Sequence, residues 1–284
     1  MVDVDAAATR AARLQPPQER RGRGAVGRHR RGLVVSVVAL ALVAGTVAGL
    51  AAGLGGGPPG PPRASIGVSG DRVVPTSVLD VPLVDQHGTT TSLSALRGRV
   101  VVLASFLTSC QETCPITTGL FLQMQRSIRA AGAAGGVVLV EASVDPGRDT
   151  PSRLAAYARV TRSDWPLLTG TPGDLAALWR YFGVFSQKVP EGTPPGIDWQ
   201  SGRPYTYDVN HSDGFMVLDA SQHLRFVTGA APDDRGHRLA GALKGMLSGQ
   251  GLRDLSSPGG PAWTEVDGLQ AIGWVLGRTV PAAS

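Results

Sequence analysis

The sequence predicts an α/β domain, a mixed sheet flanked by helices, preceded by one N-terminal transmembrane helix. Three observations support this prediction. Residues 33–54 form a long apolar run without charge, residues 99–106 and 137–144 are nearly continuous in apolar and β-branched side chains, and apolar side chains recur at helical spacing after each of these two stretches. Alternating strands and helices followed by an antiparallel pair produce a mixed sheet with helices on both faces.

The N-terminal arm, residues 1–32, carries much of the excess behind the net charge of +5. Its arginines have no aromatic-rich basic face beside them, so we interpret them as a membrane-topology signal and expect no nucleic-acid partner. At 1.5 Å per residue, residues 33–54 can cross a hydrocarbon core of about 30 Å. Positive residues stay in the cytoplasm, which predicts a single-pass cell-membrane protein with its main domain extracytoplasmic.

A cleaved signal peptide is the alternative to an anchor, because Ala48-Gly49-Leu50-Ala51 offers small residues at a plausible cleavage site. The length of the arm and of the apolar run favours an uncleaved anchor. Residues 55–73 are rich in Gly and Pro and predict a linker, and the domain is expected over residues 74–248. Residues 249–284 carry apolar residues at roughly helical spacing, but no role can be assigned to them.

The elements of the domain are predicted in order from apolar periodicity and turn residues. Residues 78–85 are typical of an edge strand, because Pro82 disfavours a central position. Residues 99–106 predict a strand buried on both faces, and a helix is expected to start at or near Cys114, with Pro115 in its first turn. The strand at 137–144 leads into a helix for which Thr150 is a candidate N-cap.

The second half of the domain follows the same pattern. A short strand at 165–168 precedes a helix at 174–182, and the Pro- and Gly-rich residues 187–205 predict a surface loop. Residues 214–219 and 223–228 predict a β-hairpin, and a last helix is expected over 234–247. Trp165 and Phe215 are expected in the core.

The two cysteines of the chain, Cys110 and Cys114, lie where a buried strand ends and a helix begins. Open α/β sheets present ligands and reagents at such positions. The positive end of the helix dipole favours thiolate over thiol, and thiolate both ligates metals and attacks disulfides. Their spacing brings both sulfurs to one side of the loop, so a shared metal and a disulfide both stay open.

Two thiolates alone leave a metal under-coordinated, and a neutral imidazole would complete a trigonal site suited to copper. The chain has five histidines. His29 lies in the basic arm, His87 in a turn, and His223 and His237 in polar surroundings. His211 directly precedes a predicted strand and could face the cysteines, although its position alone favours an ordinary surface residue.

The order and spacing of four segments resemble the SCO/SenC family of copper chaperones. These segments are residues 106–115 with both cysteines, residues 144–151 (Val-Asp-Pro-Gly-Arg-Asp-Thr-Pro), residues 165–170 (Trp-Pro-Leu-Leu-Thr-Gly) and Asn210-His211-Ser212. The resemblance covers about residues 78–247. It implies a thioredoxin-like fold, an N-terminal membrane anchor, and one copper ion, Cu(I) or Cu(II), bound by Cys110, Cys114 and His211.

The resemblance also implies a role in assembling the dinuclear copper centre of cytochrome c oxidase subunit II, either as copper donor or as reductant of its cysteines. A chaperone of this kind need not be an enzyme. Three features depart from the family pattern: Asn210 replaces the usual Asp, Ile116 replaces a common Thr, and the loop at 187–205 is long. The alternative function is a thiol–disulfide oxidoreductase or peroxiredoxin-like enzyme that uses Cys110 and Cys114.

Asp145 and Asp149 have two interpretations. A carboxylate pair can bind a hard cation, but Asp before Pro or Thr more often caps a turn or a helix. The second interpretation is favoured here.

Overall fold

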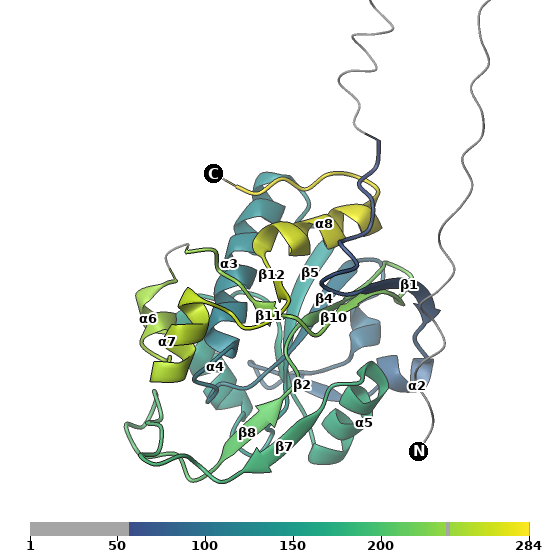
Figure 1. The fold of residues 1–284 in the computed structure, drawn as a ribbon. Coiled ribbons are helices and arrows are strands. Elements are labelled where there is room, and N and C mark those ends of the chain that lie inside the picture. Colours follow the sequence, from purple (N-terminus) through teal and green to yellow (C-terminus); the bar gives the residue numbers. More distant parts are fainter. Residues whose placement is uncertain (1–56, 237–238, 284) are drawn as a thin grey trace, which may run out of the picture. The chain divides into compact units, whose positions relative to one another are not determined.

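The computed structural model describes residues 57–236 and 239–283. The expected basic arm (1–32) and membrane anchor (33–54), and with them His29, lie outside these residues, as does His237. Within the described part of the chain, no helix is both long enough and apolar enough to cross a membrane. These residues form the predicted mixed sheet with helices packed on both of its faces (Figure 1).

The central sheet has eight strands in the order β1-β10-β9-β4-β5-β6-β2-β3. Strands β4, β5 and β6 are parallel, and every other neighbouring pair is antiparallel. The strands span Val68–Val73 (β1), Leu83–Asp85 (β2), Thr90–Thr91 (β3), Val100–Phe106 (β4), Val137–Ser143 (β5), Leu167–Thr169 (β6), Phe215–Leu218 (β9) and His223–Thr228 (β10).

Strand β4 lies in the middle of the sheet and is buried along its whole length, as its unbroken apolar sequence predicts. Its side chains alternate between two cores. Val102 and Phe106 contact the core beneath α3 (Cys114–Ala130), α4 (Pro151–Thr161) and α8 (Glu265–Leu276). Val101 and Leu103 contact the other core, which is closed by α2 (Thr76–Leu79), the 3-10 turn Leu93–Leu96 and α5 (Pro172–Phe182).

The predicted starts of α3 and α4 are confirmed, because local capping determines them. Helix α3 begins at Cys114 with Pro115 in its first turn. The hydroxyl of Thr150 accepts a hydrogen bond from the backbone N–H of Arg153 and caps α4, and Thr171 caps α5 in the same way. The hairpin of β9 and β10 is also confirmed, and Trp165 and Phe215 are buried.

Two predicted elements are wrong. Residues 76–79 form a helical turn rather than the start of a strand, and the strand that follows Pro82 lies one position in from the edge, which β3 occupies. The helix expected over 234–247 is reduced to α6, Gly241–Lys244. Gly236, with a φ of 75°, adopts the left-handed conformation that breaks a helix.

Both ends of the expected domain extend further than the sequence indicated. Residues 68–73, placed in the linker, form β1 and pair with β10. Residues after 248, which had no assigned role, form α7 (Gly249–Ser256), β12 (Ala262–Trp263) and α8. Strand β12 pairs in parallel with β11 (Ala231–Pro232), and Trp263 is fully buried. The segment from 262 to 280 therefore belongs to the same core as α3 and β4.

The expected loop at 187–205 is partly ordered. Its first residues belong to β7 (Ser186–Val189), which pairs with β8 (Asp208–His211) as a separate two-stranded ribbon. This ribbon carries His211 at its end. The ribbon lies at the bottom of Figure 1 and α7 at its left. His211 of the ribbon and Ser248 at the start of α7 both contact residues 110–114, the cysteine loop.

Candidate metal centre

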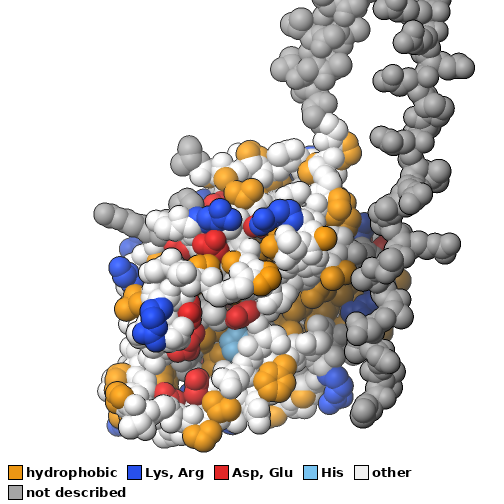
Figure 2. Space-filling view, viewed as in Figure 1, with side chains coloured by type: hydrophobic (Ala, Val, Ile, Leu, Met, Phe, Trp, Pro, Cys, Tyr) orange, Lys and Arg blue, Asp and Glu red, His pale blue; other side chains and the backbone are white. Residues whose placement is uncertain are grey.

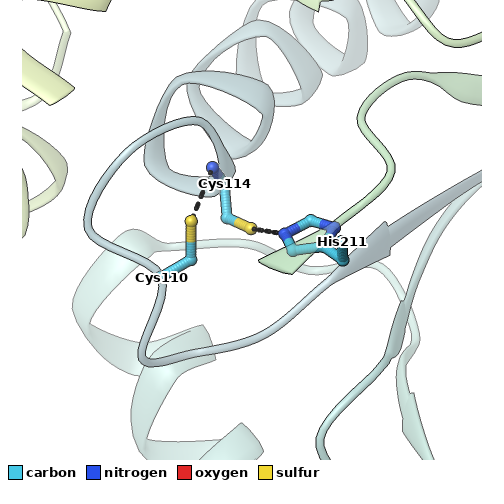
Figure 3. Close-up of side chains that lie close together, drawn as sticks. All are labelled: Cys110, Cys114 and His211. Carbon is cyan, nitrogen blue, oxygen red and sulfur yellow. Dashed lines mark hydrogen bonds between the residues drawn. The ribbon is translucent and has the colours of Figure 1, made fainter. Parts of the chain in front are cut away.

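Three side chains from two distant segments meet at the start of α3 (Figure 3). Cys110 and Cys114 are 7% and 2% exposed and their thiols are free. The Cys114 Sγ and the His211 Nε2 are 3.3 Å apart, and the Cys114 N–H points at the Cys110 Sγ from 3.4 Å. The three potential ligand atoms all lie within 4.8 Å of one another, and among the described residues they form the one such group of His, Cys, Asp or Glu.

The backbone determines which nitrogen of His211 faces the sulfurs. The Nδ1 lies 2.9 Å from the carbonyl oxygen of Ser212, which can only accept, so Nδ1 carries the hydrogen. The same carbonyl accepts a hydrogen bond from the hydroxyl of Ser105 on β4. In the neutral ring, Nε2 therefore presents its lone pair to the cysteines, the arrangement that metal-binding histidines use.

The electrostatics of the trio single out Cys110. Hydrogen bonding from Cys114 and the proximity of His211 lower the pKa of the Cys110 thiol well below its usual range, against the opposing effect of burial. Burial raises the pKa of the Cys114 thiol, and the nearby Cys110 adds to this effect. Burial would lower the pKa of His211, but hydrogen bonding and charge from Cys110 raise it overall. These opposite shifts favour Cys110 over Cys114 as the first thiol to lose its proton, and the thiolate is the form that ligates metals and attacks disulfides.

The turn that joins β5 to α4 holds the segment before Cys110. Asp149 is fully buried, and its carboxylate accepts hydrogen bonds from the Thr108 hydroxyl at 2.6 Å, from the Thr108 N–H and from the Ser143 hydroxyl at 2.6 Å. Burial raises the pKa of Asp149 to about 6, which its hydrogen bonds oppose. Its oxygens are engaged within the chain, so the cation-binding interpretation of Asp149 has no support here.

The same turn also holds the strand that carries His211. The Tyr207 hydroxyl donates to the Asp145 carboxylate, which also pairs with Arg148. The Arg148 guanidinium donates to the Tyr207 carbonyl at 2.9 Å and stacks over the Tyr207 ring, 4.0 Å from its centroid. Asp145 and Asp149 therefore connect the turn to the histidine ribbon and the cysteine loop, as structural residues rather than cation ligands.

The long connection between β7 and β8 returns to the cysteine loop. The indole N–H of Trp199 donates to the Thr108 carbonyl at 2.7 Å, and its ring packs edge-on against Tyr157. Asp198 pairs with Arg153 at 3.0 Å, and Arg153 also donates to the Thr108 hydroxyl at 2.5 Å. Sequence reasoning treated this region as a surface loop and missed these contacts. The signal that could have indicated them was Trp199 among Pro and Gly residues, because a large apolar ring is usually buried against other residues rather than left exposed in a loop.

A buried carboxyl lies under α3, the cysteine helix, which begins at Cys114. Glu141 of β5 is fully buried and accepts hydrogen bonds from the Thr118 hydroxyl at 2.7 Å and the Trp165 indole at 2.9 Å. Burial raises the pKa of Glu141 to about 7, although both hydrogen bonds oppose the shift. A carboxyl whose folded pKa exceeds its unfolded pKa binds more protons in the folded state. Its contribution to stability is full below pH 4.5 and is lost as the pH rises through about 7.

We therefore expect Glu141→Gln to remove this pH dependence. The amide retains a carbonyl for the indole and can donate to Thr118, so the folded network survives. The variant should be more stable than the wild-type chain at pH 8, by up to about 3 kcal/mol, and this advantage should shrink towards pH 5. Urea unfolding of both chains at the two pH values measures the difference. An advantage that does not change with pH would contradict the assignment of the titrating group.

Comparison of the sequence with protein-family models gives a match that includes the residues of this site. The family model described as SCO1/SenC matches residues 78–248, which is more than half of the chain. The chain belongs to the SCO1/SenC family. The resemblance inferred from the four sequence segments is thereby confirmed.

Individual relatives share between a quarter and a third of the aligned residues. A "putative copper-binding protein" of Stutzerimonas stutzeri is 29% identical over 159 residues, which cover 55% of this chain and 68% of the relative. A "SCO1 protein homolog" of Bacillus subtilis is 30% identical over 89 residues, or 30% of this chain and 45% of the relative. A mitochondrial "SCO2 homolog" of Bos taurus is 28% identical and the match covers 49% of this chain and 48% of the relative. The chain thus spans about half the length of the last two.

Solved structures of other proteins also match this chain. Bradyrhizobium japonicum ScoI, described with copper bound, is 20% identical with a TM-score of 0.45, and the match covers 63% of this chain and 97% of that one. A SCO1/SenC family lipoprotein of Bacillus anthracis is 25% identical with a TM-score of 0.42, over 52% of this chain and 82% of that one.

Acidic side chains that the sequence analysis did not consider surround the trio. Burial, together with the charges of Cys110 and Asp208, raises the pKa of Glu112 to about 7. Burial likewise raises the pKa of Asp213, which the Thr113 hydroxyl and the charge of His211 oppose. Figure 2 shows acidic side chains beside a histidine on the face that it views. Asn210 is exposed and pairs with Gln187 across the ribbon.

Proposed function

We propose that this chain binds one copper ion through Cys110, Cys114 and His211 and passes it to a recipient protein. The single observation that carries the proposal is the convergence of these three ligand atoms within 4.8 Å of one another. Two soft sulfurs and one imidazole suit copper, whose monovalent form prefers thiolate and whose divalent form accepts imidazole. A structural zinc site almost always takes four protein ligands, and this group supplies three.

The same three-ligand geometry allows the copper ion to be released. A three-ligand site leaves a position through which a ligand of the recipient can enter, so copper can move by stepwise ligand exchange. The ion leaves for the deprotonated ligands of the recipient, and protons return to the vacated thiolates and imidazole. Membership of the SCO1/SenC family is consistent with a recipient in cytochrome c oxidase assembly, and we propose its subunit II. We also propose that residues 33–54 anchor the chain, with the copper-binding domain outside the cytoplasm.

Titration of the reduced, full-length chain with Cu(I) and with Cu(II) under anaerobic conditions tests the proposal. We expect one ion per chain and, for Cu(II), a thiolate-to-copper charge-transfer absorption. The chain has two cysteines in all, so this band can arise only from Cys110 or Cys114. The double variant Cys110→Ser/Cys114→Ser should lose the band and the stoichiometric site. A wild-type chain that takes up no copper, or a double variant that binds as tightly, would refute the proposal.

A second candidate function is reduction of a disulfide in the recipient, which the low pKa of the Cys110 thiol favours. The Cys110 thiolate would attack one sulfur of that disulfide and release the other as a thiol. Cys114 would then displace the mixed disulfide, leaving a Cys110–Cys114 disulfide and two recipient thiols. His211→Ala separates the two functions, because loss of the imidazole removes a metal ligand but neither thiol. Disulfide reduction that persists in a variant unable to hold copper would favour the second candidate.

A further inference from the structure

Helix α7, which follows the last residue matched by the family model, lies directly against the cysteine loop. The backbone N–H of Ser248 donates to the Gln111 carbonyl at 2.8 Å. The Ser248 hydroxyl donates to the Glu112 carboxylate at 3.0 Å and accepts from the Gly251 N–H at 3.1 Å. Ser248 thus caps α7 and binds two of the three residues between the cysteines.

The contact is close enough to exclude a side chain at Gly251. A Cβ added there would lie 3.1 Å from the Cα of Glu112 and well inside contact distance of the Gln111 carbonyl oxygen. At Gly249, in the same helix, an added Cβ would meet only the end of the Arg253 side chain, at 3.7 Å. The first turn of α7 therefore touches the cysteine loop backbone to backbone at Gly251 and not at Gly249.

Each residue between the cysteines is held by a segment from elsewhere in the chain. The Gln111 side chain donates to the Ile197 carbonyl at 3.2 Å, and the Thr113 hydroxyl donates to Asp213 at 2.6 Å. Helix α7 adds the contacts at Ser248 and Gly251. A loop restrained in this way cannot easily change its backbone conformation.

We propose that α7 is a positioning element that holds the cysteine loop in its dithiol geometry and opposes closure of a Cys110–Cys114 disulfide. Both thiols are free, and a disulfide requires the sulfurs to approach to about 2.05 Å with a defined torsion angle. Cys110 and Cys114 bracket the loop that α7 contacts, so any backbone movement needed to close the bond has to move that loop. The proposal deepens the proposed function, since a pair kept reduced is a pair able to take copper.

The reaction that reports the restraint is exchange with glutathione. The Cys110–Cys114 bond forms while the disulfide bond of oxidised glutathione breaks, and the two thiol protons leave with the two glutathione thiols. The equilibrium constant gives the potential of the pair. If α7 opposes closure, weakening its contact makes the disulfide easier to form and the potential more negative.

Four full-length variants test the proposal beside the wild-type chain. Ser248→Ala removes both side-chain hydrogen bonds, and Gly251→Ala displaces the helix from the loop. Ser248→Thr keeps the hydroxyl, and Gly249→Ala adds the same methyl group to α7 without touching the loop. The measurements are the oxidised fraction of the cysteine pair in glutathione buffers, far-ultraviolet circular dichroism for folding, and copper stoichiometry.

We expect Ser248→Ala and Gly251→Ala to shift the equilibrium towards the disulfide about tenfold, equivalent to a potential about 30 mV more negative. Ser248→Thr and Gly249→Ala should match the wild-type chain. If one of the first two variants does not fold, the other decides. Potentials that stay at the wild-type value in folded Ser248→Ala or Gly251→Ala, or that become more positive, would overturn the proposal. Failure of the wild-type chain to bind copper would refute the proposed function but leave this comparison valid.

Discussion

Replacing His211 with alanine is expected to weaken copper binding by more than the roughly 10–100-fold that loss of an outer hydrogen-bonding partner costs. The reason is that His211 supplies the one nitrogen of the group, and its Nε2 lies 3.3 Å from the Cys114 sulfur. Without it, two thiolates leave the ion under-coordinated. The loss should be larger for Cu(II) than for Cu(I), because the monovalent ion prefers sulfur. Competition titration with a chelator of known affinity measures both constants.

His87→Ala is the matched control for this variant. His87 lies exposed in a turn after β2, so its removal should leave both copper affinities unchanged. Equal affinities in the His211→Ala, His87→Ala and wild-type chains would mean that His211 is not a ligand. The thiolate-to-copper band should persist, shifted in position, in His211→Ala, since both thiols remain.

Replacing Trp263 with alanine is expected to destabilise the folded domain by about 3–5 kcal/mol. The side chain is fully buried, and its ring packs edge-on against Phe215, with centroids 4.7 Å apart, and against Phe121 at 6.4 Å. These partners lie on the central sheet and on the cysteine helix. A cavity at this position removes the contact that joins the C-terminal segment to both. Urea unfolding monitored by circular dichroism measures the loss.

Two further variants show whether the cavity is the cause. Trp263→Phe keeps an aromatic ring and removes a buried indole N–H that has no hydrogen-bond partner among the described residues, so its cost should be much smaller. Val266→Ala, on the exposed side of α8, should change stability by less than about 0.5 kcal/mol. A loss in Trp263→Ala no larger than that of Val266→Ala would show that the segment after residue 248 is not part of the cooperative core.

The central elements could be predicted because their causes are local. The apolar residues of β4 leave no polar face, which indicates burial on both sides, and Pro115 and Thr150 mark helix starts through capping and a preset φ. The errors lie where local patterns are short. Leu79 and Val81 alternate as a strand would, but only the packing of Leu79 under α5 shows that residues 76–79 are helical.

The C-terminal segment illustrates a different limit. Its helical spacing is visible in the sequence, and Thr264 forms a capping box with Asp267 that starts α8. Neither feature says what the helix packs against. Trp263 and Ile272 enter the main core because β12 pairs with β11 and α8 packs against α3. That pairing joins residues far apart in the chain, and no sequence pattern specifies it.

By itself the sequence determined the cysteine pair, its place between a buried strand and a helix, and, through family resemblance, the choice of His211. Only the tertiary structure decided that the imidazole reaches the sulfurs, that the turn at Asp145 and Asp149 ties both ligand segments together, and that α7 contacts the cysteine loop. The physical reason is the separation along the chain of the residues that interact. Spacing and capping act within a few residues, whereas these contacts join positions 97, 41, 62 and 136 residues apart, and only the packed core brings such positions together.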